Sequence, residues 1–358
     1  MRRSALHESH RELGALFSES AGWEVVSDYG DIVSEHRSVR SAAGVVDLSH
    51  RGRLRVSGGD RVRFLHGMVT NDVKGLRDGQ GIYSAMITAQ GQTLADLKVY
   101  RRPTDFLLDT GPGLAEEVRA ALDRYLIADD VQIDDVTEAT SLLLVSGPLS
   151  ADVVGEVLGA DVSGLPEYGS AQCGSATVVR SDDTGERGFL LFVEPVEARR
   201  LWAGIQELGL SVRPVGQRAF SVLRMEAGVP VYGLDIEKRY TPIESGIAHA
   251  VSLDKGCYIG QEVISKMTFR GKPRRHLVGF VLAGDVPPTP GDTVMVDGRD
   301  AGHATSGLLS LSLNQIIAFG YVKRDLNRPG TKVQIASNAR RLEGEVVGLP
   351  FYRRQEQP

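Results

Sequence analysis

One cysteine of this sequence stands in a context that could make its thiol reactive. Cys257 follows Lys255 and Gly256 in the octapeptide Lys-Gly-Cys-Tyr-Ile-Gly-Gln-Glu, residues 255–262, and a helix is expected to begin just after it. A neighbouring cation and the positive end of a helix dipole both favour the thiolate. The alternative is structural, because an isolated cysteine is most often a small buried apolar residue. The octapeptide alone leaves both interpretations open.

The counts of cysteine and charged residues restrict the class of protein. The 358 residues include two cysteines, Cys173 and Cys257, which cannot form a disulfide framework and favour a reducing compartment. The formal net charge of -5 argues against a general nucleic-acid-binding protein. No pattern of metal ligands and no apolar run of membrane-spanning length is recognisable. We therefore expect a cytoplasmic protein without a metal site and without nucleic-acid or membrane partners.

The elements that would position this chemistry alternate between helix and strand. The helical spacing of Leu6, Leu13, Leu16 and Phe17 predicts a helix at the start of the chain. Residues 83–88 and 93–101 predict paired strands around a glycine-containing turn. Further helices are expected over residues 32–43, 114–125 and 196–208.

The pattern of polar and apolar residues changes after Phe269. The polar segment 270–276 predicts a linker, and the short apolar runs beyond it, separated by Pro-Gly and Asp-Gly pairs, predict a small β-barrel or sandwich. These patterns together favour an α+β fold. They divide the chain into a larger domain over residues 6–271 and a C-terminal β domain over residues 272–353.

Several segments resemble the folate-binding superfamily of the glycine-cleavage T protein, and they occur in the family's order along almost the whole chain. They include Ala43–His50, Thr70–Val73, Gly79–Tyr83, Asp96–Tyr100, Thr184–Phe189, Leu223–Gly228 and Leu349–Tyr352. The resemblance implies a ring of three subdomains, in which two intertwined α+β subdomains and a C-terminal β-barrel surround a cavity. It also implies that the cavity binds tetrahydrofolate or a one-carbon derivative of it.

The octapeptide resembles the signature of the YgfZ branch of this superfamily, in which a Phe-Arg-Gly triplet follows, here residues 269–271. That resemblance implies a protein that supports the assembly or repair of iron–sulfur proteins, with iron–sulfur client or assembly proteins as partners. Cys257 would be the functional thiol and Lys255 the cation that activates it.

The resemblance also implies a set of residues around the folate. Glu186 matches the glutamate that binds the edge of the pterin ring, and Asp96 matches the carboxylate beside the nitrogens that carry the one-carbon unit. Tyr83, Tyr100, Phe220 and Arg224 match further positions around the ligand. Each has a structural alternative, because Glu and Asp are mostly solvated and aromatic residues commonly fill cores.

The alternative function is enzymatic. A tetrahydrofolate-dependent aminomethyltransferase, or a related demethylase, would need Asp96 and could dispense with Cys257, and its partner would be a lipoyl carrier protein. Two departures from the T-protein pattern weaken this reading: Ala95 precedes Asp96 where two adjacent acids are usual, and Asp109-Thr110-Gly111 replaces an asparagine. Whether the protein is an enzyme therefore stays open at this point.

Overall fold

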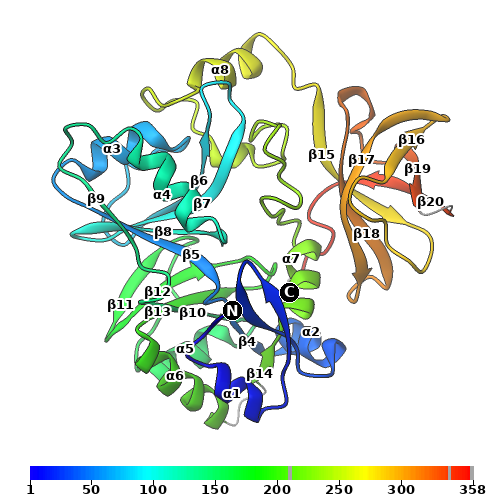
Figure 1. The fold of residues 1–358 in the computed structure, drawn as a ribbon. Coiled ribbons are helices and arrows are strands. Elements are labelled where there is room, and N and C mark those ends of the chain that lie inside the picture. Colours follow the sequence, from blue (N-terminus) through cyan, green and yellow to red (C-terminus); the bar gives the residue numbers. More distant parts are fainter. Residues whose placement is uncertain (209–211, 338–339, 355–358) are drawn as a thin grey trace.

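Two open sheets and one closed barrel form the main body of the computed structural model, which describes residues 1–208, 212–337 and 340–354. The three parts surround a common centre, with helix α7 (Gln217–Glu226) lying between the barrel and the lower sheet (Figure 1). The expected α+β class, with intertwined sheets and a C-terminal barrel, is confirmed. Among the described residues, no helix has the length and apolar character needed to cross a membrane.

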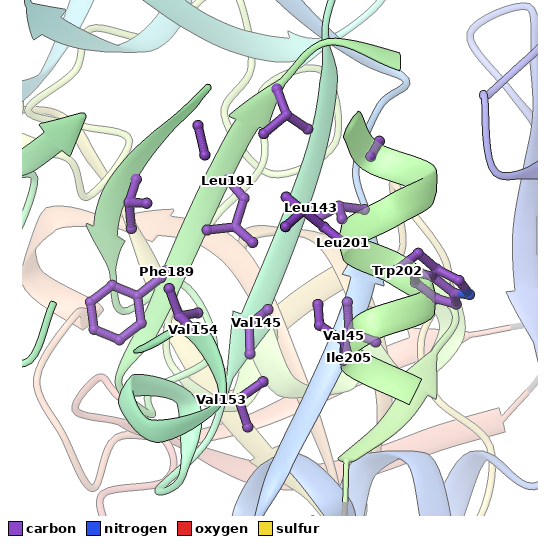
Figure 2. Packing of buried hydrophobic residues seen from close by; sticks show 14 of the residues in the cluster. Val45, Leu143, Val145, Val153, Val154, Phe189, Leu191, Leu201, Trp202 and Ile205 are labelled. Atoms are coloured by element: carbon purple, nitrogen blue, oxygen red, sulfur yellow. The ribbon is translucent and has the colours of Figure 1, made fainter. Parts of the chain in front are cut away.

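The four central strands of the six-stranded sheet are buried on both faces and are apolar almost throughout. Its order is β11-β12-β13-β10-β4-β14. The strands are β4 (Ala43–Asp47), β10 (Ser141–Ser146), β11 (Ser170–Cys173), β12 (Ala176–Ser181), β13 (Gly188–Val193) and β14 (Val212–Val215). Leu143 and Val145 of β10 point to helices α5 (Ser150–Leu158) and α6 (Pro195–Glu207), as Figure 2 shows. Leu142 and Leu144 point to the opposite face and pack toward α2 (Ile32–Ser41) and α7.

The five-stranded sheet is covered by helices on one face only, which leaves its other face free to build a site. Its order is β6-β7-β8-β5-β9. The strands are β5 (Arg51–Ser57), β6 (Gly81–Ile87), β7 (Thr93–Arg101), β8 (Asp105–Pro112) and β9 (Gln132–Asp135). Helices α3 (Arg61–Met68) and α4 (Ala115–Asp123) contribute Phe64, Leu65, Val118 and Leu122 to the core beneath it. This sheet is inserted between β4 and β10, so the two sheets are intertwined.

The C-terminal part is a closed barrel in the order β15-β18-β17-β16-β19-β20. Its strands are β15 (Arg275–Leu282), β16 (Thr293–Val296), β17 (Arg299–Ser310), β18 (Gln315–Lys323), β19 (Lys332–Ser337) and β20 (Arg340–Val347), with a short helical turn η2 (Arg324–Leu326) after β18. The segment between helix α8 (Gln261–Phe269) and β15 connects it to the rest of the chain. Residue 271, in this segment, remains our proposal for the domain boundary.

A buried carboxylate attaches the barrel to the end of α7. Glu226 is fully buried and accepts hydrogen bonds from Ser310 and Ser312 of the barrel, at 2.7 and 2.8 Å. Arg40 and His36 of α2 contact Oε2, the oxygen that also accepts from the Ser312 hydroxyl, at 2.7 and 2.9 Å. Burial alone would raise the pKa of Glu226, but the hydrogen bonds from His36 and Arg40 hold it well below its usual value. The charge is thus compensated on every side.

The prediction of one helix from Leu6 to Phe17 is wrong. Helix α1 spans only His7–Glu12, and Leu16 and Phe17 lie on β2 (Leu16–Ser20), which pairs with β3 (Trp23–Asp28) beside β1 (Arg2–Arg3). Gly14 stops the helix because it adopts a φ of +76° and its N–H bonds back to the carbonyl of Arg11. The apolar spacing was therefore divided between two elements.

Gly260 of the octapeptide fixes the start of α8. It precedes the helix with a φ of +79°, and a Cβ placed on it would lie 2.3 Å from the carbonyl oxygen of Thr88 in the β6–β7 turn. Neither the backbone conformation nor the space admits a side chain. The octapeptide is therefore docked closely on the hairpin that carries Tyr83.

We predict that Gly260→Ala lowers the free energy of unfolding by about 2 kcal/mol, because it adds backbone strain to a steric clash. Gly256→Ala is the matched control, since its Cβ would meet nothing nearer than His66 Nε2 at 3.6 Å. Urea unfolding of both variants measures the difference. Equal midpoints for the two would contradict the steric role of Gly260.

Candidate active site

A cavity of about 510 Å³ lies on the uncovered face of the five-stranded sheet. Its other walls come from the turn between β12 and β13, from α7, and from residues 227–234 and 246–249. The volume is in the range of small-molecule binding sites. The lining combines aromatic and apolar side chains with several charged groups, which is suited to a flat ligand with polar edges.

The alternation of β7 places its polar residues on the cavity face. The side chains of Ala95, Leu97 and Val99 belong to the core under α3 and α4, although Leu97 also borders the cavity, and Asp96 and Lys98 give the cavity its polar groups. Successive side chains of a strand point to opposite faces. The same register pairs Lys98 with Tyr83 of β6 on one side and with Asp109 of β8 on the other. One polar row thus crosses three strands.

Asp96 is held by an aromatic neighbour. The Tyr83 hydroxyl donates to Asp96 Oδ2 at 2.8 Å, and the Tyr83 ring stacks on His249 with centroids 5.2 Å apart. All three residues line the cavity. Burial raises the pKa of the Asp96 carboxyl, and it lowers the pKa of His249. The carboxyl can therefore hold or accept a proton closer to neutral pH than an ordinary aspartate.

Four further charges lie on the same wall. Lys98 Nζ is 2.5 Å from both carboxylate oxygens of Asp183, in the turn after β12, and Arg51 contacts Asp183 at 3.4 Å and Asp109 at 2.8 Å. Burial would raise the pKa of Asp183, but the charges of Lys98 and Arg51 hold it at about 2. At Asp109 burial dominates and the pKa is raised. The wall thus contains one carboxyl group that stays ionised, Asp183, and one whose ionised form is disfavoured by burial, Asp109.

Helix α7 presents a stripe of side chains to the cavity. Gln217, Phe220, Ser221 and Arg224 all line it and recur at intervals of three and four residues, which is one face of a helix. Arg224 Nη1 also donates to Asp235 Oδ2 at 2.7 Å and to the carbonyl of Val229 at 3.0 Å. Its guanidinium is therefore held by the segment that follows α7.

Two of the residues expected around the folate, Glu186 and Tyr100, are not brought into the cavity. Glu186 is buried, but its oxygens contact Arg40 at 3.3 Å and Arg354 at 2.8 Å, and it is not among the lining residues. Tyr100 is fully buried between the sheets, and its hydroxyl has no hydrogen-bond partner among the described residues. The arginines occupy both oxygens of Glu186, so the structure differs from the expected ring-edge contact.

The octapeptide thiol is also outside the cavity. Cys257 is exposed and does not line it. The Lys255 ammonium does not serve as the thiol's cation, because it donates to the carbonyl oxygens of His66, Val69 and Asn71. An ammonium has three N–H donors, and these contacts use all of them. The expectation that Lys255 activates Cys257 is corrected by this geometry.

Sequence reasoning missed Lys98, Asp183 and His249. Lys98 had a local signal, because it lies two residues after Asp96 and so shares its strand face. Asp183 and His249 had none, since they reach the cavity from segments far along the chain. Asp96, Tyr83, Phe220 and Arg224 are brought together as expected.

Two family models match this chain. The GCVT N-terminal domain matches residues 6–255, and the glycine cleavage T-protein C-terminal barrel domain matches residues 275–353. The aminomethyltransferase of Rubrobacter xylanophilus is 37% identical over 360 residues, which cover 99% of this chain and 95% of the relative. That of Streptomyces avermitilis is 34% identical over 366 residues, covering 99% and 98%. The crystal structure of glycine cleavage system aminomethyltransferase T from Bartonella henselae has a TM-score of 0.92 and 28% identity, covering 98% of both chains.

These comparisons correct one expectation. The interpretation of the chain as a YgfZ-like protein that supports iron–sulfur proteins is wrong, because curated relatives named aminomethyltransferase match it from end to end. Similarity along the whole chain is stronger evidence than the single octapeptide that contains Cys257. The iron–sulfur partners expected with that interpretation have no support either.

We predict that Asp183→Asn lowers the free energy of unfolding by about 3 kcal/mol at neutral pH, because it leaves Lys98 buried without its counter-charge. The pKa of Asp183 rises from about 2 in the folded protein to its ordinary value of 3.8 on unfolding. The unfolded state therefore binds more protons between these values, and the advantage of the wild type is lost as the pH falls from about 5 to 2.

The neighbouring Asp182→Asn is the control, since Asp182 pairs with Arg180 at a more exposed position. Its cost should stay under about 1 kcal/mol. Urea unfolding at pH 7 and pH 3 compares the variants. A difference between wild type and Asp183→Asn that stays constant with pH would contradict the role given to this ion pair.

Proposed function

This chain belongs to the glycine cleavage T-protein family, and from this premise we propose that it is a tetrahydrofolate-dependent aminomethyltransferase. Its donor is an aminomethyl group attached to the sulfur of a lipoyl carrier protein. The one-carbon unit passes to tetrahydrofolate, the carbon–sulfur bond breaks, and the products are methylene-tetrahydrofolate, ammonia and the carrier's free dithiol. The observation that carries the proposal is Asp96, held by Tyr83 on the wall of the cavity.

The residues of the cavity fit this substrate. The pterin is a flat ring with donors and acceptors on its edge, and tetrahydrofolate, when bound, would supply the two amine nitrogens that take up the one-carbon unit, one in the pterin and one beside it. Phe220, Tyr83 and His249 offer aromatic surfaces for a flat ring. Arg224 and the backbone of residues 227–231 line the same space and offer polar contacts. Because Glu186 lies outside the lining, we assign the ring-edge contacts to the cavity residues and give Glu186 and Tyr100 a supporting role.

Asp96 supplies the electrostatic part of the mechanism. A carboxylate beside the reacting carbon stabilises the positive charge that develops there as its bond to sulfur breaks. The hydrogen bond from Tyr83 fixes the orientation of the carboxyl, and the raised pKa allows it to take up a proton from an amine. Asp183 stays ionised beside it because of Lys98 and Arg51, whereas burial raises the pKa of Asp109 on the same wall as it does that of Asp96.

We predict that Asp96→Asn lowers the rate of methylene-tetrahydrofolate formation about 100-fold or more, because it removes the charge and keeps the shape. The assay uses an aminomethylated lipoyl carrier protein as donor. Asp105→Asn is the control: Asp105 is buried on the neighbouring strand β8, pairs with Arg102, and does not line the cavity. No product above the no-enzyme background with the wild type would refute the proposed function.

A second prediction concerns the thiol. Cys257→Ser should retain the wild-type rate, within about twofold, because Cys257 is exposed and does not line the cavity. The same assay measures it. A loss comparable with that of Asp96→Asn would show that the thiol takes part in the reaction.

A further inference from the structure

Lys255 is the residue of the octapeptide that the structure buries with its charge. Its residue surface is 7% exposed, and its ammonium donates to the carbonyl oxygens of His66, Val69 (2.7 Å) and Asn71 (2.9 Å). A buried ammonium is stable only when such partners replace water. The three carbonyls therefore hold the cation, and the cation in turn holds three points of the segment 66–71.

Two of these carbonyls lie at the end of α3. The last carbonyls of a helix have no partner within the helix, and they carry the negative end of its dipole. Lys255 therefore caps α3 through His66 and Val69. The amide N–H of Ile259 adds a hydrogen bond to the carbonyl of Gly67 at 3.2 Å. The octapeptide and the helix end thus form one unit.

The third carbonyl belongs to Asn71, which reaches the cavity wall. The Asn71 side-chain amide donates to the carbonyl of Tyr83 at 2.9 Å and to the carbonyl of His249 at 3.1 Å. Thr70 adds a hydrogen bond from its hydroxyl to the carbonyl of Ala250 at 2.6 Å. His249 and Ala250 form the helical turn η1 (Ala248–Ala250). Asn71 is therefore the bridge between strand β6 and the segment that bears His249.

Tyr83 and His249 are the two rings that this bridge joins. Their stacking and the Tyr83 contact with Asp96 described above both depend on the separation of β6 and η1. We propose that Lys255 is a positioning residue for the cavity: through Asn71 it holds Tyr83 against His249 and keeps the Tyr83 hydroxyl on Asp96. The kinetic consequences of this inference rest on the proposed function, whereas its structural consequences do not.

The protonation of Lys255 gives the arrangement a pH dependence. Burial lowers the pKa of Lys255 to about 8, and the charge of Asp72 opposes this shift. The other titratable groups beside it are His66 and Tyr258, whose ring centre is 5.0 Å from Nζ, and Lys74 in turn acts on His66. Loss of the proton removes one of the three N–H donors.

Stability and positioning respond to this proton in opposite directions. An unfolded lysine has a pKa of about 10.4, so the unfolded state binds more protons than the folded state between pH 8 and 10. Titration of Lys255 therefore does not lower the free energy of unfolding in this range. It does weaken the contacts of segment 66–71, so the rate should fall while the protein stays folded.

The first test needs no catalysis. In the free protein the ring protons of His249 should be shifted by the Tyr83 ring current, and their NMR signals can be assigned with His249→Gln. Lys255→Met, which keeps the length of the side chain and removes the ammonium, should move these signals toward random-coil values. Cys257→Ser, from the same octapeptide, should leave them unchanged. Unchanged signals in folded Lys255→Met overturn the inference.

If Lys255→Met does not fold, Asn71→Asp tests the next contact, because it removes the amide donor to Tyr83 and His249 and keeps the shape. It should move the same signals, and unchanged signals there also overturn the inference. A wild type without turnover refutes the proposed function but leaves this NMR result to decide the role of Lys255.

The second test is a double-mutant cycle in the aminomethyltransfer assay. In the wild-type background, Lys255→Met should lower kcat about 10-fold or more. In a Tyr83→Phe background, where the hydroxyl contact with Asp96 is already lost, the factor by which it lowers kcat should be about fivefold smaller. The fall of the wild-type kcat between pH 7 and 9 should be absent in Lys255→Met. Equal factors in both backgrounds, or a wild-type kcat that does not change with pH, would refute the coupling to Asp96.

Discussion

The ion pair between Lys98 and Asp183 connects the two intertwined sheets at the cavity. Lys98 belongs to β7 of the five-stranded sheet, and Asp183 to the turn after β12 of the six-stranded sheet. Either charge would be costly to bury without the other, so Lys98 of one sheet needs Asp183 of the other sheet as its partner. The site beside Asp96 therefore exists only where the sheets meet. An ionised pair next to a carboxyl of raised pKa gives that carboxyl a fixed electrostatic environment.

Much of the fold could be predicted because it rests on local periodicity. The alternation of β7 identifies its buried face, and turn residues mark the barrel strands. Helix α2 could be expected as a helix, but its apolar pattern does not identify its buried face, because three of its buried residues, Glu35, His36 and Ser38, are polar. The helix through Phe17 failed because a single glycine, Gly14, outweighs apolar spacing. Asp96 could be placed on the cavity face of its strand. Asp183 could not be matched with Lys98, since their pairing is set by the docking of two sheets and leaves no local pattern.

The octapeptide shows how adjacency in sequence differs from adjacency in space. Lys255 and Cys257 are two residues apart, which suggested a cation beside a thiol. In the irregular backbone before α8 the lysine is buried under α3 and the cysteine is exposed to solvent. The motif therefore connects to the cavity through Asn71, and its cysteine lies on the outside. Whole-chain similarity corrected the functional interpretation, and the hydrogen bonds of Lys255 show which residue of the motif is built into the fold.

The interrupted sheet has a consequence for synthesis. Strand β4 ends at Asp47, but its partner β10 begins at Ser141, with the entire five-stranded sheet between them. At a translation rate of about 5–20 residues per second, β4 waits on the order of ten seconds for its neighbour to leave the ribosome. During that time its apolar residues have no sheet to join. The five-stranded sheet can form first, and the nascent chain must keep an earlier strand unpaired until a later one encloses it.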